Sequence, residues 1–400
     1  ATSNALITAA GNATNTIADN DTATLTLDSP VVTEGGIATY AVTLTAATAS
    51  GFTIDYTTAS GTALEATDFS DSTGTLAFLG TAGETQTFTV ATTPDLIVEG
   101  TETLNITLSA LSNAFGGALT FPAAAQPRDI ADDDTATVAI ALSAGGDGAE
   151  PGADNGEFTV TMSTTSATPT TVSYTLGAGT ATSGADFAAL PGSVIIPANS
   201  LTAVIAVDVL DDLIVEGAET VIVDLTPATS NASITAAGSA TVSIADDDTS
   251  TVSIANTTNG TEAGPANGTM TVTMTNQSST ATTVSYTLGA GTATSGTDFT
   301  ALPLTVVVPA LTSSATITIP VLDDVIVEGG ETVIVNLTAA TSNAAITAAG
   351  SATNTIADND ISNVTIANIT DATEPATDGV IRLTLSNPSA TATTVTYTAA

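Results

Sequence analysis

The sequence predicts an all-β fold, made of tandem seven-stranded immunoglobulin-like sandwiches in a linear array. Three observations predict it. Short runs rich in Val, Ile and Thr alternate apolar and polar residues, as half-buried strands do, and no helical periodicity accompanies them. Long motifs return at intervals of 112 to 114 residues, which is the size of one immunoglobulin-like sandwich. In the repeat that shows the pattern most clearly, residues 249–360, the acidic residues gather between the predicted strands and not within them.

The composition excludes several classes of function. The 400 residues include 41 Asp and Glu, two Arg and no Lys, for a formal net charge of −39. We expect no nucleic-acid partner, because phosphate binding needs clustered Lys or Arg. We expect no membrane insertion, because no apolar run reaches spanning length. The absence of Cys and His excludes disulfides, the usual zinc and copper sites and histidine-based catalysis.

The chain is nevertheless expected to fold. Hydrophobic residues make up 43% of it and charged residues only 11%, whereas a disordered acidic tail is poor in apolar residues. Without disulfides or lysine cross-links, bound ions are the remaining source of extra stability for a secreted protein. The sequence starts at Ala1 and not at Met, so we interpret it as part of a longer protein.

Two motifs define the repeat. The 15 residues of Thr170–Gly184 recur unchanged at Thr282–Gly296, an offset of 112. A segment with the pattern Asp-x-Ile-Val-Glu-Gly-x-Glu, here called the acidic loop, occurs at 95–102, 212–219 and 324–331. Such self-similarity over more than a hundred residues predicts whole repeated domains and excludes short helical repeats.

A cluster of acidic residues ends each repeat, and these terminal clusters follow one another at spacings of 113, 114 and 112. They lie at Asp19-Asn20-Asp21, Asp132-Asp133-Asp134, Asp246-Asp247-Asp248 and Asp358-Asn359-Asp360. The predicted divisions are 1–21 for the tail of a preceding repeat, 22–134 for repeat 1, 135–248 for repeat 2, 249–360 for repeat 3, and 361–400 for the opening of a further repeat. The two end fragments together are too short to close one more domain.

Repeat 3 shows the strand pattern most clearly. Val333, Val335 and Leu337 fall on one face of a predicted strand, and Thr332 and Asn336 on the other. The seven strands of this repeat are predicted at 250–254, 268–275, 283–288, 304–308, 314–321, 332–338 and 351–356.

Every acidic residue of repeat 3 falls outside these strands. Connections in an antiparallel sandwich alternate between its two ends, so the loops after the first, third and fifth strands should meet the exit of the last strand at one pole. The eight carboxylates expected there belong to Glu262, Asp298, Asp323, Asp324, Glu328, Glu331, Asp358 and Asp360. Two unit charges 4 Å apart repel by about 1 kcal/mol in water and about 4 kcal/mol at an effective dielectric of 20.

A cluster of oxygen ligands without Lys suits Ca²⁺, which takes about 6–8 oxygens in irregular geometry. Mg²⁺ suits it less, because Mg²⁺ requires a strict octahedron and keeps several waters. The alternative is that the acids only confer solubility. Acids that serve solubility would be scattered over the strand faces, and those faces carry Thr and Ser instead. We therefore predict a metal site at each pole.

The motifs resemble the Calx-beta domain, which is known from sodium–calcium exchangers and from large bacterial surface proteins. Repeat 2 shows the family pattern with Glu150, Gly179-Thr180-Ala181, Asp186-Phe187, Asp211-Asp212 before the acidic loop, Asn231-Ala232 and Asp246-Asp247-Asp248. The resemblance recurs in each repeat and covers nearly the whole chain.

The resemblance implies a seven-stranded Calx-beta sandwich with calcium ions among its loops, more than one ion per repeat. In repeat 2 the implied ligands are Glu150, Asp186, Asp211, Asp212, Glu216, Glu219, Asp246, Asp247 and Asp248. In repeat 1 they are Glu34, Asp68, Asp95, Glu99, Glu102, Asp132, Asp133 and Asp134. Repeat 1 departs at Pro94, which stands where repeat 2 has Asp211, and its longer region 111–129 carries Arg128. Pro94 predicts weaker or fewer ions there.

The sequence favours a structural protein over an enzyme or a sensor. Near-identical copies suit an array that needs length, such as a rod or filament, or the stalk of a cell-surface adhesin. A calcium sensor would rarely repeat itself so closely. Glu216 and Glu219 resemble a glycosidase pair, but Trp is absent and aromatic residues are 4%, so no sugar platform is expected. We expect an extracellular or cell-surface location, with other copies of the chain or surface and matrix components as partners.

Overall fold

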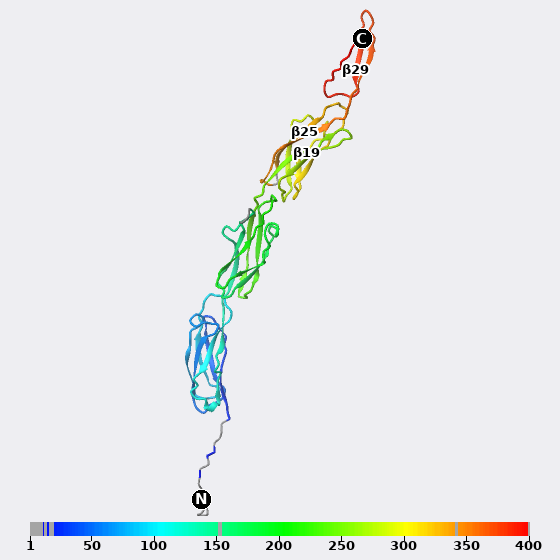
Figure 1. Cartoon of the computed structure of the whole chain (residues 1–400). Coiled ribbons are helices and arrows are strands. Elements are labelled where there is room, and N and C mark those ends of the chain that lie inside the picture. The colour runs from blue at the N-terminus through cyan, green and yellow to red at the C-terminus, as the bar shows by residue number, and fades with distance from the viewer. Residues whose placement is uncertain (1–10, 12–13, 16–19, 151–153, 341–342, 399–400) are drawn as a thin grey trace, which may run out of the picture.

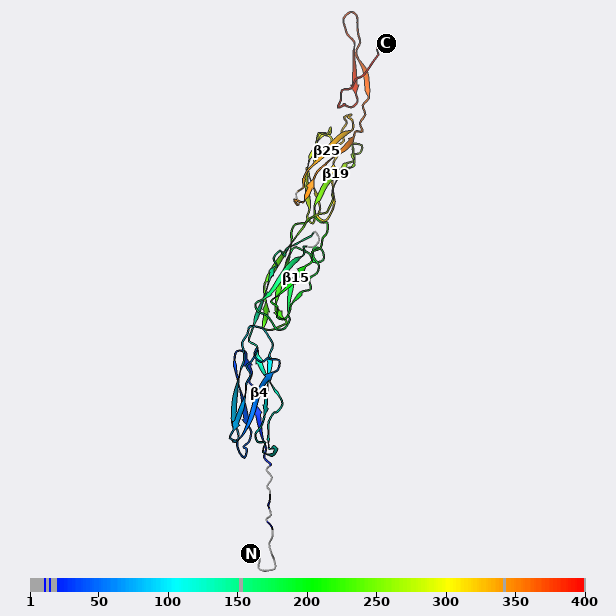
Figure 2. The same cartoon turned by 60° about the vertical axis from the view of Figure 1, so that its left-hand side comes forward.

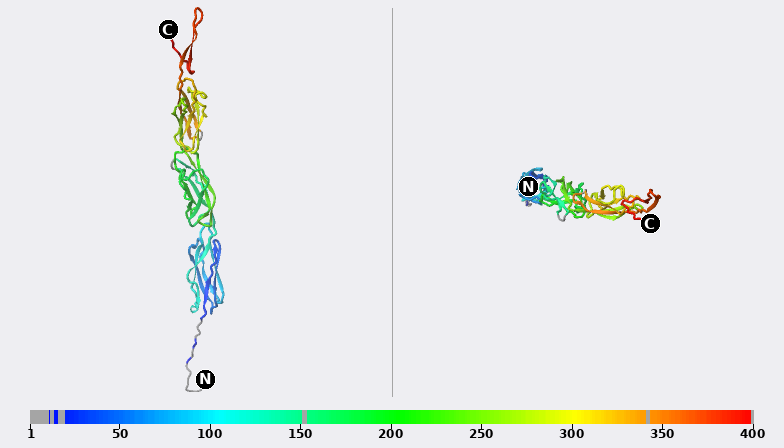
Figure 3. Two further views of the ribbon diagram at one scale, coloured as in Figure 1. Left: turned by 90° about the vertical axis from the view of Figure 1, so that its right-hand side faces the viewer. Right: turned by 90° about the horizontal axis from the view of Figure 1, so that it is seen from above.

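The structure is a computed structural model that describes residues 11, 14–15, 20–150, 154–340 and 343–398. Three β-sandwiches follow one another in a line, and a two-stranded hairpin comes after the third (Figure 1). Views turned by 60° and by 90° show the same extended succession (Figures 2 and 3). The all-β prediction is confirmed. The predicted tail of a preceding repeat, 1–21, lies largely outside the described residues.

Each sandwich pairs a four-stranded sheet with a five-stranded sheet. In repeat 1 the strand orders are β6-β3-β1-β8 and β2-β9-β7-β4-β5. Its elements are β1 (Ala23–Leu27), β2 (Val32–Thr33), β3 (Ile37–Leu44), β4 (Phe52–Ser60), β5 (Thr73–Phe78), β6 (Thr85–Ala91), β7 (Glu102–Ser109), the 3-10 turn η1 (Phe115–Gly117), β8 (Leu119–Thr120) and β9 (Gln126–Ala131).

Repeat 2 has the orders β15-β12-β10-β17 and β11-β18-β16-β13-β14. Its strands are β10 (Ala136–Leu142), β11 (Gly148–Ala149), β12 (Gly156–Met162), β13 (Thr170–Leu176), β14 (Ser193–Ile196), β15 (Thr202–Val207), β16 (Glu219–Thr229), β17 (Ile234–Ala236) and β18 (Ser239–Ala245). The main strands pair antiparallel, while the short β17 and β11 pair parallel with β10 and β18.

Repeat 3 has the orders β24-β21-β19-β26 and β20-β27-β25-β22-β23. Its strands are β19 (Ser250–Thr258), β20 (Gly260–Thr261), β21 (Gly268–Met274), β22 (Thr282–Leu288), β23 (Thr305–Val308), β24 (Ser314–Ile319), β25 (Glu331–Ala340), β26 (Ile346–Ala348) and β27 (Ser351–Ala357). The predicted fragment that opens a further repeat contains the hairpin of β28 (Val364–Thr370) and β29 (Val380–Leu385).

All seven strands predicted for repeat 3 are found, with boundaries that differ by a few residues. β19 continues to Thr258, and β24 ends at Ile319 instead of residue 321. The short strands β20 and β26 were not predicted. Each has only two or three residues and is held by parallel pairing with a long strand, so neither has an alternation long enough to detect.

Alternating side chains fill a separate hydrophobic core in each sandwich. In β7, for example, Leu104, Ile106 and Leu108 all point inward and are fully buried. A phenylalanine outside the regular strands joins each core: Phe69 in repeat 1, Phe187 in repeat 2 and Phe299 in repeat 3. Each of these phenylalanines directly follows an Asp of the predicted metal site. The core therefore fixes the position of that carboxylate.

One interior position differs among the three repeats. It holds Arg128 in β9, Val242 in β18 and Asn354 in β27, and all three side chains are buried. Arg128 donates from Nε to the carbonyl oxygen of Asp28 at 2.8 Å. Asn354 donates from Nδ2 to Oδ1 of Asn256 at 2.6 Å. Local acceptors thus satisfy the buried polar side chain in repeats 1 and 3, and repeat 2 has an apolar side chain at this position.

Neighbouring repeats are connected through the acidic loop, in a contact that we call the joint. Val98 of repeat 1 donates its N–H to the carbonyl of Thr165 at 2.9 Å, and Ala167 donates back to the Val98 carbonyl at 3.0 Å. The same two hydrogen bonds, of 2.8 and 3.1 Å, link Val215 to Gln277 and Ser279 of repeat 3. The pattern occurs a third time, at 2.8 and 3.1 Å, between Val327 and the loop of Pro388 and Ala390.

In the first two joints the valine packs in the core of the following repeat and not in its own. Val98 is 0% exposed and belongs to the hydrophobic cluster of repeat 2. Val215 is 0% exposed and belongs to that of repeat 3. Two positions earlier, Leu96 and Leu213 are 72% and 68% exposed. The acidic loop thus inserts the valine into the next sandwich, while the leucine two positions earlier faces solvent.

Candidate metal sites

An aspartate at the start of each acidic loop sets the backbone of that loop. Oδ1 of Asp95 accepts a hydrogen bond from the N–H of Ile97 at 2.6 Å, and Asp212 does the same for Ile214 at 2.6 Å. Asp324 accepts from Ile326 at 2.7 Å. An aspartate side chain bonded two residues ahead makes an Asx turn, which offers the backbone a compact alternative to a strand.

The terminal cluster binds the acidic loop by its first aspartate. In repeat 2, Oδ2 of Asp246 accepts from the N–H of Glu216 at 2.7 Å, and its Oδ1 accepts from the N–H of Asp248 at 2.9 Å. Asp132 and Asp358 make the same pair of bonds in repeats 1 and 3. The exit of the last strand and the acidic loop therefore meet at one pole, as the alternation of loops predicts.

The carboxylates at these poles form groups of three whose oxygens lie within 4.8 Å of one another, which we call trios. In the described residues of repeats 2 and 3 each pole holds two trios, and repeat 1 holds one. The trios are Glu34, Asp132 and Asp134; Glu150, Asp246 and Asp248; Asp186, Glu216 and Glu219; Glu262, Asp358 and Asp360; Asp298, Glu328 and Glu331.

Four of these carboxylates are buried and the others are half-buried, and in repeats 2 and 3 no basic residue offsets their charge. Glu150, Asp186, Glu262 and Asp298 are 3–8% exposed. Repeats 2 and 3 contain no basic residue at all. Several carboxylate oxygens at the poles are buried and accept no hydrogen bond, namely those of Glu34, Glu102, Glu150, Glu219, Asp248, Glu262, Glu331 and Asp360. A buried oxygen without a hydrogen-bond donor has lost its hydration and has no interaction that compensates for the loss. These carboxylate clusters therefore require a cation or protons. An all-oxygen donor set fits Ca²⁺.

Burial and mutual repulsion raise the pKa of the glutamates at the poles. Burial, followed by repulsion from Asp246 and Asp212, raises the pKa of Glu150 to about 8. Burial first, and then repulsion from neighbouring acids, raises the pKa to about 7 for Glu34 and Glu262. Burial is also the largest cause for Glu102, Glu219 and Glu331, whose pKa is raised to about 7 with the help of a side-chain hydrogen bond to Asp68, Asp186 or Asp298 and of repulsion. A protein without metal therefore holds protons at these poles near neutral pH.

Ten of the predicted site residues lie outside the trios. Asp133 and Asp247 are the middle residues of extended terminal clusters and face solvent, because successive side chains of an extended chain alternate in direction. Asp211 and Asp323 are also exposed. Asp95, Asp212 and Asp324 form the Asx turns, from which they add negative charge to the nearby trios. The others are Asp68, Glu99 and Glu102 of repeat 1.

Repeat 1 differs from the other two in its second group of acids. Asp68, Glu99 and Glu102 are close enough to raise the pKa of Glu102, yet among the described residues they do not close to the spacing of a trio. Pro94 replaces an aspartate that is exposed in repeats 2 and 3 and lies outside their trios. The expectation of fewer ions in repeat 1 stays a prediction, and the spacing of these three acids gives a second reason for it beside Pro94.

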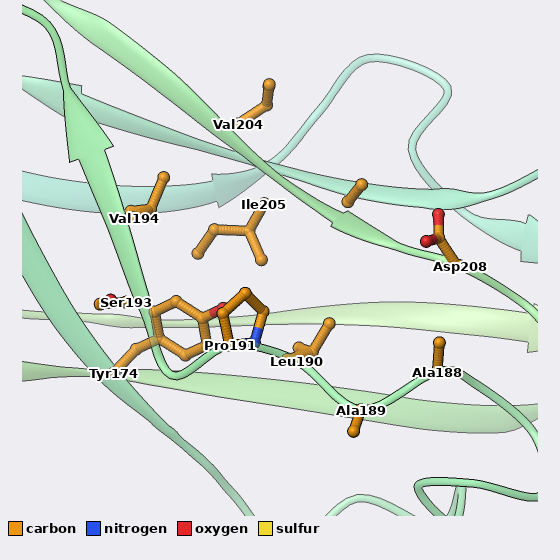
Figure 4. Close-up of a pocket in the computed structure, with 11 residues that line it drawn as sticks. Tyr174, Ala188, Ala189, Leu190, Pro191, Ser193, Val194, Val204, Ile205 and Asp208 are labelled. Atoms are coloured by element: carbon orange, nitrogen blue, oxygen red, sulfur yellow. The ribbon is translucent and has the colours of Figure 1, made fainter.

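A hollow of about 350 Å³ lies elsewhere on repeat 2, at the open side between β14 and β15 (Figure 4). Tyr174, Pro191 and Ile205 line it, and Asp208 is the one acidic residue in its wall. A single carboxylate does not make a cation site, so the hollow is separate from the candidate metal sites. In the described part of the chain, no helix has the length and apolar character needed to cross a membrane.

The fold and the acidic poles define a tandem array of β-sandwich domains of the calcium-binding type. The chain belongs to the Calx-beta domain family, whose sequence model matches residues 18–141, 153–248 and 246–360. A search of the curated proteins found no match.

Solved Calx structures are among the similar ones. The apo form of the Calx CBD1 domain is 23% identical, with a TM-score of 0.25, and the match covers 28% of this chain and 100% of that chain. The calcium binding domain CBD12 of CALX1.1 is 20% identical, with a TM-score of 0.26, over 54% of this chain and 96% of that chain.

The raised pKa values predict how the metal-free protein responds to pH. The folded pKa of about 8 for Glu150 and about 7 for Glu34 and Glu262 exceeds the unfolded value near 4.5. The folded state therefore binds more protons, and its stability is lost as pH rises through the folded pKa values. In chelator, we expect the melting temperature to fall from pH 5 to pH 8. Calcium should remove most of that slope, because calcium and protons compete for the carboxylates. A melting temperature that rises with pH in chelator would contradict the electrostatics described above.

A matched pair of substitutions tests the difference between repeats 1 and 2. Glu219→Gln removes a trio member, so calorimetric titration of the full chain should show one bound calcium fewer. Glu102→Gln changes the corresponding residue of repeat 1, where no trio closes, and should leave the number of ions unchanged. An equal loss of one ion in both variants would show that repeat 1 binds like repeat 2.

Proposed function

We propose that the protein is a calcium-stabilised extracellular structural protein whose tandem sandwiches form a rod or filament. The observation that carries the proposal is that one short loop serves both the metal site and the joint. Val215 lies in the core of repeat 3, and the next residue, Glu216, belongs to a trio of repeat 2. A cation that orders this loop would therefore also hold the next domain in place.

One Ca²⁺ per trio would give five ions in the described residues. The ion would supply positive charge to buried oxygens that accept no hydrogen bond, such as Oε2 of Glu150 and of Glu262. Each trio provides only three of the roughly 6–8 oxygens that Ca²⁺ takes. Backbone carbonyls, water and second oxygens of the same carboxylates would supply the others.

The same features support a non-catalytic role. The chain has no His, Cys or Lys, and the carboxylate pairs at the poles lack the aromatic residues with which a glycosidase would hold a sugar, since Trp is absent from the sequence. The partners we propose are other copies of the chain or components of a cell surface or matrix. Electron microscopy of the native material distinguishes two forms of the proposal, since ordered fibres indicate a filament and isolated surface projections indicate an adhesin stalk.

The metal proposal predicts that Glu150→Gln has opposite effects on stability in chelator and in calcium. Gln keeps the shape of the side chain and is neutral without having to bind a proton, so the variant should melt higher than the native chain in chelator near neutral pH. In calcium it should gain less stability, and binding about tenfold weaker corresponds to about 1.4 kcal/mol. The matched control is Asp224→Asn, which places on β16 the residue that repeat 3 carries at Asn336. Calorimetry in calcium and in chelator measures both. Native and Glu150→Gln chains with equal calcium responses would refute the assignment.

Calcium should also set the stiffness of the whole chain. Without it, like charges repel within each pole and the acidic loop loosens, so that the joints bend. Small-angle scattering of the full chain should show a longer and narrower distance distribution in calcium than in chelator. Circular dichroism under both conditions verifies that the sandwiches stay folded. If they do and the two scattering profiles coincide, calcium orders loops inside each domain and leaves the joints free.

A further inference from the structure

A small apolar cavity lies at the start of repeat 1. Its volume is about 50 Å³, and its walls include Ala23, Ala47, Ala49, Phe115 and Leu119. We call it the socket. Its polar lining residues are Asp21, Thr22 and Thr48, and the other six are Ala, Phe or Leu. The mainly apolar wall suits an apolar side chain.

The socket stands at the position that receives the valine in the other repeats. The loop between the second and third long strands has the same length in each, from Thr45 to Phe52 in repeat 1 and from Ser163 to Thr170 in repeat 2. Ala47 and Ala49 therefore correspond to Thr165 and Ala167, which accept from and donate to Val98. Leu119 corresponds to Ile234, since both pair parallel with the first strand.

The matching groups of repeat 1 are free. Within the described residues, neither the carbonyl of Ala47 nor the N–H of Ala49 has a hydrogen-bond partner. Thr48, which lies between them, is half-buried, whereas its counterparts Ser166 and Ser278 are 1% and 2% exposed beneath their valines. Repeat 1 thus presents an acceptor, a donor and an apolar cavity in the arrangement that the two complete joints use.

We propose that the socket is a docking surface for one more repeat of this type, held directly ahead of Thr22, whose acidic loop places its valine in the cavity. Continuity with the two complete joints identifies the partner. The acceptor on Ala47 and the donor on Ala49 fix the direction in which the loop must run. The inference depends on the joints and is independent of whether calcium binds.

The joint between repeats 1 and 2 tests whether the valine protects the amide that it covers. Val98→Ser removes the apolar side chain from the core of repeat 2, and amide exchange at Ala167 should become at least about tenfold faster. Leu96→Ser changes an exposed residue of the same loop and should leave that exchange unchanged. Equal exchange at Ala167 in the two variants would show that the valine does not hold the joint, and the proposal would fail with it.

The socket itself is tested in the full chain with a copy of residues 135–248 inserted between Asp21 and Thr22. Asp248 of the copy then meets Thr22 as it meets Thr249 in the native sequence. Amide exchange at Ala49 should slow at least about tenfold on insertion. Leu213→Ser in the copy should keep this protection, and Val215→Ser in the copy should abolish it. Unchanged exchange in the other core amides of the copy verifies that Val215→Ser has not unfolded it.

Two results would overturn the proposal. One is an Ala49 amide that exchanges equally fast with and without the inserted repeat. The other is protection that survives Val215→Ser in the copy, which would mean that general contact and not the valine covers the socket. If protection of Ala49 in the native chain rises with protein concentration, the occupant is a second copy, and the assignment to a repeat ahead of Thr22 is wrong.

Discussion

Repulsion among buried carboxylates is the constraint on which this architecture depends. Each pole of repeats 2 and 3 collects two trios of acids, and these repeats contain no basic residue to offset them. The two ways to neutralise such a cluster are protons and cations. The pKa of about 8 at Glu150 shows that protons can neutralise the cluster. The buried oxygens that accept no hydrogen bond are available to a cation. This arrangement of carboxylates is unfavourable alone, and a bound ion would convert it into a gain in stability.

The poles are coupled to the hydrophobic cores by adjacent residues. Asp186 belongs to a trio and Phe187 to the core of the same repeat. Glu216 belongs to a trio and Val215 to the core of the next repeat. A change at the metal site is thus one residue away from two cores. If an ion binds at a trio, it would also act on the contact between domains, because the acidic loop contributes to both.

Much of this arrangement was predictable from the sequence. Alternating apolar residues placed all seven long strands of repeat 3, and the order of loops placed the acids at one pole. Asp133 and Asp247 lie outside the trios because successive side chains of an extended chain point in opposite directions. The sequence alone does not show that the terminal cluster is extended. The joint was missed. Its signal was present, since an invariant Ile-Val pair sits inside an acidic loop in all three repeats. Sequence alone does not show that the valine fills a neighbour's core, because hydrophobic patterning identifies buried residues without identifying the domain that buries them.

The buried position that holds Arg128, Val242 and Asn354 has a consequence for how the array is made. Tandem domains of near-identical sequence tend to misassemble, because a strand from one copy can pair within another. A strand moved between these repeats would carry a guanidinium or an amide into a core that lacks its acceptors, the carbonyl of Asp28 or the side chain of Asn256. An unpaired buried polar group of this kind is costly. This interior side chain would therefore disfavour an exchange of last strands between repeats and favour the pairing of each last strand within its own sandwich.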